Sequence, residues 1–247
     1  MRPDPRRLEE LGLNSSAPPG QLLYDGWLLR LLPGKAKRAR SVNAVYPSSL
    51  PVEEKIAYCE RLFGAARVPA LFRMTPFSQP AELDAVLERR GYGRFDLTAV
   101  ESADIDPSRT ASRATPMPLE PWIDAITAIR KASHVERAAH LARLQATPLA
   151  IRPLAILEGG DVVATGLTIV EDDCAGLFDI VVREESRRKG HARALVESLL
   201  AAAWELGARH AYLQVNADNA AARRLYASFG FEERYMYWYR GRPGEQR

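Results

Sequence analysis

The organisation of this chain can be predicted outward from residues 177–192, which read LFDIVVREESRRKGHA. Apart from Asp179, the first six of these residues are apolar and mostly β-branched or aromatic, which is typical of a short strand. From Ala192 onward, apolar residues recur at the three-and-four spacing of one helix face until Gly207. Residues 187–192 therefore lie at a strand-to-helix turn.

This turn, RRKGHA, has the properties of an anion site. The first N–H groups of a helix have no partner within it, and the helix dipole favours an anion there by about 0.3–1 kcal/mol. Gly190 and Ala192 leave those amides accessible because they have little or no side chain. The basic side chains around them are Arg187, Arg188, Lys189, His191 and Arg193. The alternative, a turn glycine on a solvated basic surface, stays open at this point.

Composition restricts the class of protein. A chain of 247 residues with 47% hydrophobic content predicts one or two domains with a substantial core, and a net charge of +3 gives no reason to expect a polyanionic partner. Cys59 and Cys174 stand alone, which favours neither a disulfide framework nor a zinc site. The N-terminus is polar and no apolar run is long enough for a membrane span, so we expect a soluble, cytoplasmic protein.

The stretch from Ala103 to Pro118 is polar and rich in proline, which predicts a linker at residues 103–117. It separates an N-terminal domain at residues 21–102, preceded by an extension at residues 1–20, from a C-terminal domain at residues 118–247. The patterns of the C-terminal domain predict the order helix, helix, three strands, helix, strand, helix, strand. Upstream, we expect strands at Gly26–Leu32, Ser41–Tyr46, Leu71–Met74 and Phe95–Val100, and helices at Glu53–Phe63 and Pro80–Arg89.

The C-terminal domain resembles the GNAT N-acetyltransferase superfamily. The phosphate signature of that superfamily is Arg or Gln, two free positions, Gly, one free position, and Gly or Ala, and Arg187, Gly190 and Ala192 meet it. A later motif extends from Leu213 to Phe231 and includes Asn219, Ala222, Leu225, Tyr226 and Gly230. The resemblance covers residues 118–240 and implies an α/β (α+β) fold, with a mixed central sheet opened by a V-shaped splay.

The N-terminal domain resembles the degenerate amino-terminal half of two-domain, tandem GNAT proteins. The resemblance lies in residues 25–30 and 38–43. This half has no Arg-x-x-Gly-x-Ala loop, and Leu87 stands where Tyr226 stands in the other half. We therefore expect a smaller GNAT-like domain without a site, and one complete site in the chain.

The resemblance implies acetyl-CoA as co-substrate and no metal. Backbone groups of Ile180, Val181 and Val182 would pair with the pantetheine arm, and an amide there would polarise the thioester carbonyl. Amides of residues 188–192 would take the pyrophosphate, and Asn219 would bond the pantetheine, with a helix cap as its alternative role. The implied cofactor-binding residues are Ile180, Val181, Val182, Arg187, Arg188, Lys189, Gly190, His191, Ala192, Asn219 and Tyr226.

Two residues are candidates for catalysis. Tyr226 stands at the general-acid position of the family and would donate a proton to the departing thiolate, with a packed aromatic as the alternative. Asp179, on the strand face opposite Phe178 and Ile180, would deprotonate the amine or bind its ammonium form, unless it forms a buried salt bridge with an arginine. Glu171 and Asp173 are further candidates for the base, but we favour their interpretation as turn residues. His134 and His140 lie in the helices that shape the acceptor pocket in the family, and we favour their interpretation as surface histidines.

The expected function is acetyl transfer to a primary amine of a small molecule, an amino acid or a peptide, by direct attack on the thioester. The alternative is an acyl-CoA sensor without turnover. A third interpretation, a nucleic-acid binder that uses the basic residues Lys35, Lys37, Arg38 and Arg40, is less favoured than a solvated edge. The acceptor and the oligomeric state stay open, a homodimer being one alternative.

Overall fold

The computed structural model describes residues 2–32, 34 and 36–245. The chain divides into two compact units. Unit 1 comprises Met1–Ser15, Val100–Val215 and Asn219–Arg234, and unit 2 comprises Ser16–Ala99, Asn216–Asp218 and Tyr235–Arg247. These units interleave along the chain, whereas the sequence led us to expect consecutive segments. The expected domain limits stay a prediction, since compactness alone does not define an independently folding domain.

Unit 1 holds the mixed sheet that the sequence predicts for the C-terminal part. Its helices are α1 (Pro5–Ser15), α4 (Leu119–Arg130), α5 (His134–Ala146), α6 (His191–Glu205) and α7 (Ala220–Ala227). Its strands are β6 (Thr115–Pro116), β7 (Ala150–Glu158), β8 (Asp161–Glu171), β9 (Cys174–Val182) and β10 (His210–Asn216), together with parts of β5 (Gly93–Asp104) and β11 (Glu232–Gly241). The strand order is β11-β5-β10-β9-β8-β7-β6, with β6 to β9 antiparallel and β9 parallel to β10.

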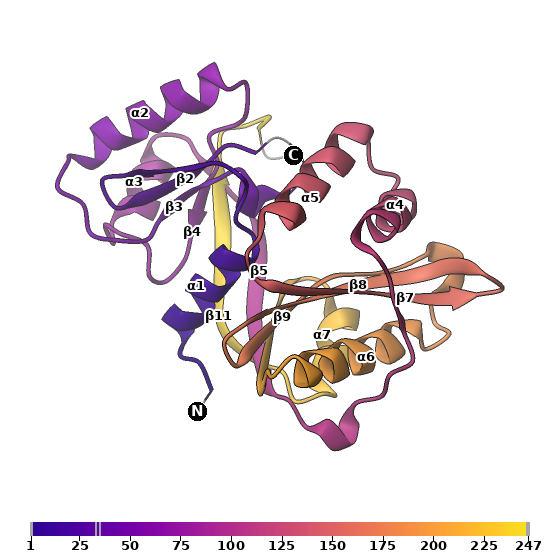
Figure 1. Ribbon diagram of the computed structural model, residues 1–247. Helices are drawn as coiled ribbons and strands as arrows, with labels where there is room; N and C mark the ends of the chain where they lie inside the picture. Colours follow the sequence, from indigo (N-terminus) through magenta and orange to yellow (C-terminus); the bar gives the residue numbers. More distant parts are fainter. Residues whose placement is uncertain (1, 33, 35, 246–247) are drawn as a thin grey trace. The chain divides into compact units, whose positions relative to one another are not determined.

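Helices cover both faces of β7, β8 and β9, with α6 on one face and α4 on the other (Figure 1). The alternation along β8 explains this arrangement. Leu167 and Ile169 join the α4 core, which includes Trp122, Ile123 and Ile126. Gly166 lies on the α6 face, where a Cβ would come within 2.8 Å of the Leu199 side chain, so a larger residue would force that side chain to move.

Unit 2 is built around a second apolar core. Its elements are β1 (Gln21–Tyr24), β2 (Trp27–Arg30), η1 (Lys37–Ala39), β3 (Val42–Ala44), α2 (Val52–Ala65), β4 (Phe72–Met74) and α3 (Leu83–Arg89), with parts of β5 and β11. The strand order is β1-β2-β3-β4-β11-β5, in which β3 and β4 are parallel. The most buried aromatic side chains of the core are Trp27, Phe63, Phe72 and Tyr92.

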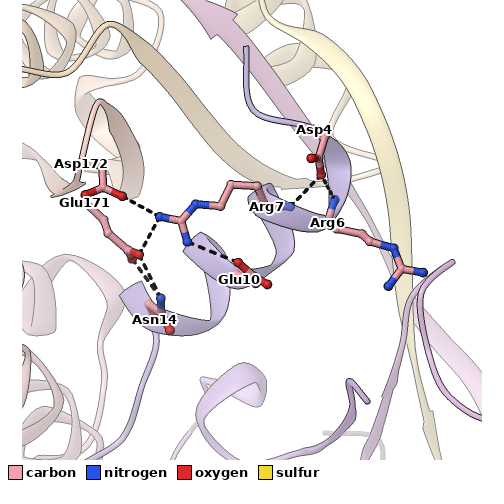
Figure 2. A network of polar contacts seen from close by, with 7 residues as sticks. All are labelled: Asp4, Arg6, Arg7, Glu10, Asn14, Glu171 and Asp172. Atoms are coloured by element: carbon pink, nitrogen blue, oxygen red, sulfur yellow. Dashed lines mark hydrogen bonds and ion pairs between the residues drawn. The ribbon is translucent and has the colours of Figure 1, made fainter. Parts of the chain in front are cut away.

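Helix α1 is the largest element that the sequence analysis missed, since residues 1–20 were expected to form an extension. Asp4 accepts hydrogen bonds from the amides of Arg6 (2.8 Å) and Arg7 (3.0 Å), which caps the helix, and Pro5 occupies its first position. Figure 2 shows Arg7 and Asn14 reaching Glu171, and Arg7 also reaching Asp172. The Asp-Pro start followed by Leu8 and Leu11, both fully buried, was the signal that could have found this helix.

The described basic residues of the run, Lys37, Arg38 and Arg40, do not form the solvated edge that the sequence predicted. Lys37 pairs with Asp96 at 3.1 Å, and Arg40 is only 7% exposed. Burial lowers the pKa of Arg40. Lys35 lies outside the described residues. The run therefore packs within unit 2, which weakens its interpretation as a nucleic-acid surface.

Two further differences concern short elements. Strand β1 was not predicted, and β6 lies within the segment expected to be a linker. Helix α3 begins at Leu83 rather than at Pro80. The remaining predicted helices and strands are present, with bounds that differ by a few residues.

Candidate active site

Strands β9 and β10 pair over only part of their length. The paired register runs from Cys174 opposite His210 to Leu177 opposite Leu213, although β9 continues to Val182 and β10 to Asn216. The partly exposed residues Ile180, Val181 and Val182 follow the end of this pairing. This is the position at which the predicted V-shaped splay would begin, since no further β9–β10 pairing is present among the described residues beyond Leu177 and Leu213.

A β-bulge lies in the same part of β9. Thr165 of β8 pairs with Val181 and Leu167 pairs with Phe178, so that Asp179 and Ile180 together stand opposite Gly166. Asp179 adopts a left-handed backbone conformation with φ of +54°. The extra residue interrupts the alternation of the strand. As a result, Asp179 points to α4 and α5, the side on which Phe178 also packs, and our prediction that it faces away from Phe178 was wrong.

Asp179 is surrounded by positive charge. Its Oδ1 lies 2.9 Å from Nη1 of Arg130, and its Oδ2 lies 3.0 Å from Nε2 of His140 and 4.0 Å from Nη2 of Arg143. Burial alone would raise the pKa of Asp179, but the charge of Arg130, followed by that of His140, outweighs burial and holds this pKa well below its ordinary value of 3.8. Asp179 thus forms a buried salt bridge with an arginine, which was one of the two alternatives that the sequence left open.

The turn between β9 and α6 has the open backbone that was expected. Gly190 is the N-cap of α6 with φ of +86°, and no side chain caps the first amides of the helix. A Cβ at Gly190 would meet no atom within 4 Å. Arg188 is also left-handed, with φ of +64°. The first amides of α6 are therefore accessible to an anion from outside the protein.

The basic side chains of this turn have different partners. Arg187 and Arg188 are exposed, whereas Lys189 and His191 lie 3.3 and 3.0 Å from the carboxylate of Glu158. Arg193 donates to Ser228 at 2.8 Å and stacks over Phe229. The arginines at 187 and 188 are thus the cations that a phosphate would meet first.

Helix α7 carries the two other predicted site residues. Asn219 is its N-cap and accepts a hydrogen bond from the amide of Ala222 at 3.1 Å, so its alternative role as a helix cap is present. Tyr226 is 8% exposed and packs against Phe231. Burial, and secondly the negative charge of Glu101, raise the pKa of Tyr226 to about 12.

Several polar residues near these positions were not identified from the sequence. Arg130 and Arg143 were not considered, and His140, expected at the surface, is only 16% exposed in its side chain and lies against Trp122. His134, in contrast, is exposed. Glu101 is 3% exposed and binds Arg223 at 2.8 Å. The spacing of His140 and Arg143, which places both on one face of α5, was the available signal.

The acidic residues of the β8–β9 turn have structural partners. Glu171 binds Arg7 and Asn14, as Figure 2 shows, and Asp173 lies 3.8 Å from His210. Both therefore act as turn residues, as expected. Across the residues that the structure describes, no group of three or more His, Cys, Asp and Glu side chains could hold a metal ion, and no helix is long and apolar enough to cross a membrane.

Residues 120–231 match the family model described as the acetyltransferase (GNAT) family. This part of the chain is a GNAT acetyltransferase domain. The match contains the open edge of β9, the turn at residues 187–192 and helix α7. The resemblance seen in the sequence motifs is therefore confirmed.

The chain has one relative over nearly its whole length and others over a shorter stretch. It is 28% identical over 246 residues to the uncharacterized N-acetyltransferase YobR of Bacillus subtilis, covering 96% of this chain and 98% of that protein. A 78-residue stretch is 40% identical to the bS18-alanine N-acetyltransferase of Escherichia coli, covering 32% of this chain and 53% of that enzyme. These relatives identify the chain as an N-acetyltransferase.

A solved structure shares the fold of nearly the whole chain. It is a GCN5-related N-acetyltransferase from Kribbella flavida, 18% identical, with a TM-score of 0.68. The likeness covers 97% of this chain and 94% of that one. The mixed α/β fold predicted from the sequence is confirmed.

Proposed function

We propose that this GNAT protein transfers the acetyl group of acetyl-CoA to a primary amine, which attacks the thioester directly. The observation that carries the proposal is the end of β9–β10 pairing at Leu177 and Leu213, followed on the same strand by a turn with uncapped helix amides. An open strand edge suits the amide-bearing pantetheine arm, and the helix start suits a pyrophosphate.

The residues proposed to hold the co-substrate follow from this arrangement. The backbone of Ile180 to Val182 would pair with the pantetheine amides, and an N–H there would polarise the thioester carbonyl. Amides of residues 188–192, with Arg187 and Arg188, would bind the pyrophosphate. The amide nitrogen of Asn219 remains able to donate to the pantetheine, since only its oxygen serves the cap.

Tyr226 is the proposed proton donor. Its raised pKa, about 12, keeps the phenol protonated at neutral pH. A free thiol has a pKa of about 8.5, but burial raises that of a thiol as it does for the phenol. In this chain burial raises the pKa of Cys174 to about 12. If the departing thiolate is similarly buried, the pKa of its thiol would be close to that of Tyr226. Proton transfer from Tyr226 to the thiolate would then cost little free energy.

We propose that Asp179 binds cationic side chains and is not the general base. A carboxylate whose pKa is held far below neutral is a weak proton acceptor. Of the roles expected for Asp179, cation binding is thus the one we retain, with Arg130 and Arg143 as the cations in this structure. Loss of the ammonium proton would follow from desolvation and from the neighbouring positive charge, since both lower the pKa of an amine.

The proposal is tested by calorimetric binding of acetyl-CoA and by thiol release with a panel of amines, amino acids and peptides. Tyr226→Phe should lower kcat by about 10²–10⁴ while leaving the Kd of acetyl-CoA unchanged. No binding of acetyl-CoA by the wild type would refute the proposal. Binding without thiol release from any amine would favour the alternative, an acyl-CoA sensor.

The setting of the reaction is also proposed. The E. coli relative is named for the alanine of a ribosomal protein, so a peptide α-amine belongs in the panel beside small amines. The free, buried thiols of Cys59 and Cys174 fit a reducing compartment, and we propose the cytoplasm. We also propose that residues 21–102 are the degenerate GNAT-like half and that this half holds no second catalytic site.

A further inference from the structure

Tyr226 lies on a short helix that has little apolar packing of its own. Helix α7 spans eight residues, all of which the structure describes, and Tyr226 alone among them is buried. A proton donor acts only when its hydroxyl lies within hydrogen-bond distance of the acceptor, so the proposed step depends on where α7 sits on the sheet. The polar contacts of α7 therefore matter for the placement of the Tyr226 hydroxyl.

Arg223 holds α7 by two ion pairs. It stands three residues before Tyr226, and residues with this spacing are neighbours on one side of a helix. Its Nε donates to Oε1 of Glu101 at 2.8 Å, and its Nη2 donates to Oε2 of Glu233 at 2.8 Å. Glu101 belongs to β5 and Glu233 to β11, which are neighbours in the sheet. The planar guanidinium therefore fixes α7 relative to two strands at once.

The place of β5 in the sheet explains why Arg223 meets Glu101. Helix α7 connects β10 to β11 along the chain, but β5 lies between these two strands in the sheet. The helix therefore crosses over β5, whose part from Val100 onward belongs to unit 1 together with α7. Along the sequence, however, Glu101 falls within residues 21–102, the segment proposed to be the degenerate half.

Packing does not explain the carboxylate of Glu101. Glu101 is 3% exposed, and burying a carboxylate costs free energy that an apolar side chain of similar size would not cost. Its Oε2 is buried and has no hydrogen-bond partner among the described residues, so Arg223 compensates the charge through one oxygen. Burial is the first cause of the raised pKa of Tyr226 and the charge of Glu101 the second, so this charge lies close enough to act on the phenol. A buried charge kept beside the proposed proton donor favours a role in the reaction.

Two further arginines bind the C-terminal end of α7. Arg193 of α6 donates to the hydroxyl of Ser228 at 2.8 Å, and Arg109 donates to the carbonyl of the same residue. Both bonds are exposed to solvent, whereas the bond from Arg223 ends on the buried carboxylate of Glu101. Because exposed charged contacts contribute little, the pair of Arg223 and Glu101 is the stronger constraint on the helix.

We propose that Glu101 and Arg223 are positioning residues for Tyr226, in which Glu101 anchors Arg223 on the sheet and Arg223 holds the turn of α7 that carries the hydroxyl. The proposal rests on the proposed role of Tyr226 as proton donor. It also gives the degenerate half a part in catalysis, since β5 supplies Glu101 although no second catalytic site is proposed for that half.

Arg223→Gln tests this role by thiol release with the best amine of the panel and by calorimetry with acetyl-CoA. The side chain of Arg223 is 30% exposed, so its replacement leaves no buried cavity. We expect kcat to fall at least tenfold, while KM for the amine and Kd for acetyl-CoA change less than twofold, because the position of a proton donor affects the chemical step. Arg224→Gln is the matched control, since Arg224 is the next residue of the same helix and is exposed. Its kcat should equal that of the wild type.

A double-mutant cycle separates positioning from a general loss of structure. If Arg223 acts through Tyr226, it has no hydroxyl to position in Tyr226→Phe, so adding Arg223→Gln to that variant should change kcat less than twofold. Glu101→Gln should also lower kcat, but by less than Arg223→Gln, because the amide oxygen can still accept from Arg223. Arg223→Lys, which keeps the charge but loses the planar fork, should retain part of the activity.

An unchanged kcat in Arg223→Gln would overturn the proposal while leaving acetyl transfer intact. Losses that multiply when Arg223→Gln and Tyr226→Phe are combined would also overturn it, since Arg223 would then act independently of the phenol. A loss of acetyl-CoA affinity as large as the loss of kcat would assign Arg223 to binding instead. Wild-type kcat in Tyr226→Phe alone would refute the proposed proton donor itself, so the two failures are distinguishable.

Discussion

Leu177 and Leu213 are the last residues at which β9 and β10 pair, although both strands continue beyond them. Amides of β9 that would face β10 after this point have no strand partner there. We expect the segment Phe178–Val182 to exchange its amide hydrogens faster than Cys174–Leu177, and to become protected when acetyl-CoA is added. Hydrogen–deuterium exchange measures both. Protection that appears elsewhere but not in this segment would contradict the assignment of β9 to the pantetheine.

Gly190 should be required for cofactor binding. Gly190→Val forces a β-branched residue into a left-handed backbone, at a cost of roughly 1–3 kcal/mol, and also places a side chain in front of the first amides of α6. Gly207→Val is the matched control, because Gly207 follows the same helix with φ of +97° and open space around it. Both variants should lose similar stability in urea. Calorimetry should show a Kd for acetyl-CoA that is at least tenfold weaker in Gly190→Val only, and equal values would refute the loop assignment.

Asp179 should make stability depend on pH in the acid range. Its pKa in the folded protein lies below the ordinary value of 3.8, so ionised Asp179 stabilises the fold above that pH. This contribution is lost as the pH falls below about 4 toward the folded pKa. Asp179→Asn should therefore be less stable than the wild type at pH 7, and the difference should shrink as the pH approaches 3. Urea midpoints between pH 3 and 7 measure it, and a constant difference would show that the ion pair with Arg130 and Arg143 does not form.

Helix α1 should contribute to the stability of unit 1. Leu8 is fully buried, so Leu8→Ala should cost about 2–5 kcal/mol. Leu23→Ala removes the same atoms from a side chain that is 72% exposed and should cost under about 0.5 kcal/mol. Urea unfolding compares the two variants. Equal midpoints would mean that residues 5–15 do not pack as a helix against unit 1.

Much of the fold could be predicted from the sequence because the signals that specify it are local. The strand, turn and helix at residues 177–206 show their apolar periods and their terminal glycine directly. Asn219 as a helix cap is a local signal of the same kind. Helix α1 was missed although its own Asp-Pro start was visible, since the polar residues between its leucines hid the period.

Only part of the candidate site could be predicted from the sequence. The turn around Gly190 and the position of Tyr226 could be placed from motif spacing alone. The orientation of Asp179 could not, because one inserted residue in β9 reverses the alternation from which it was inferred. Arg130 and Arg143 were overlooked for a related reason. The spacing of His140 and Arg143 places both on one face of α5, but no local pattern indicates that this face meets a carboxylate of β9.

The amino-acid sequence was therefore sufficient for the order of the helices and strands from α4 to β11, the turn at residues 187–192 and the resemblance to the GNAT family, since each depends on neighbours along the chain. Tertiary structure decided the partners of Asp179 and the burial that raises the pKa of Tyr226 to about 12. The physical reason is that charge pairing and desolvation depend on distances between separate elements, and no local pattern specifies those distances.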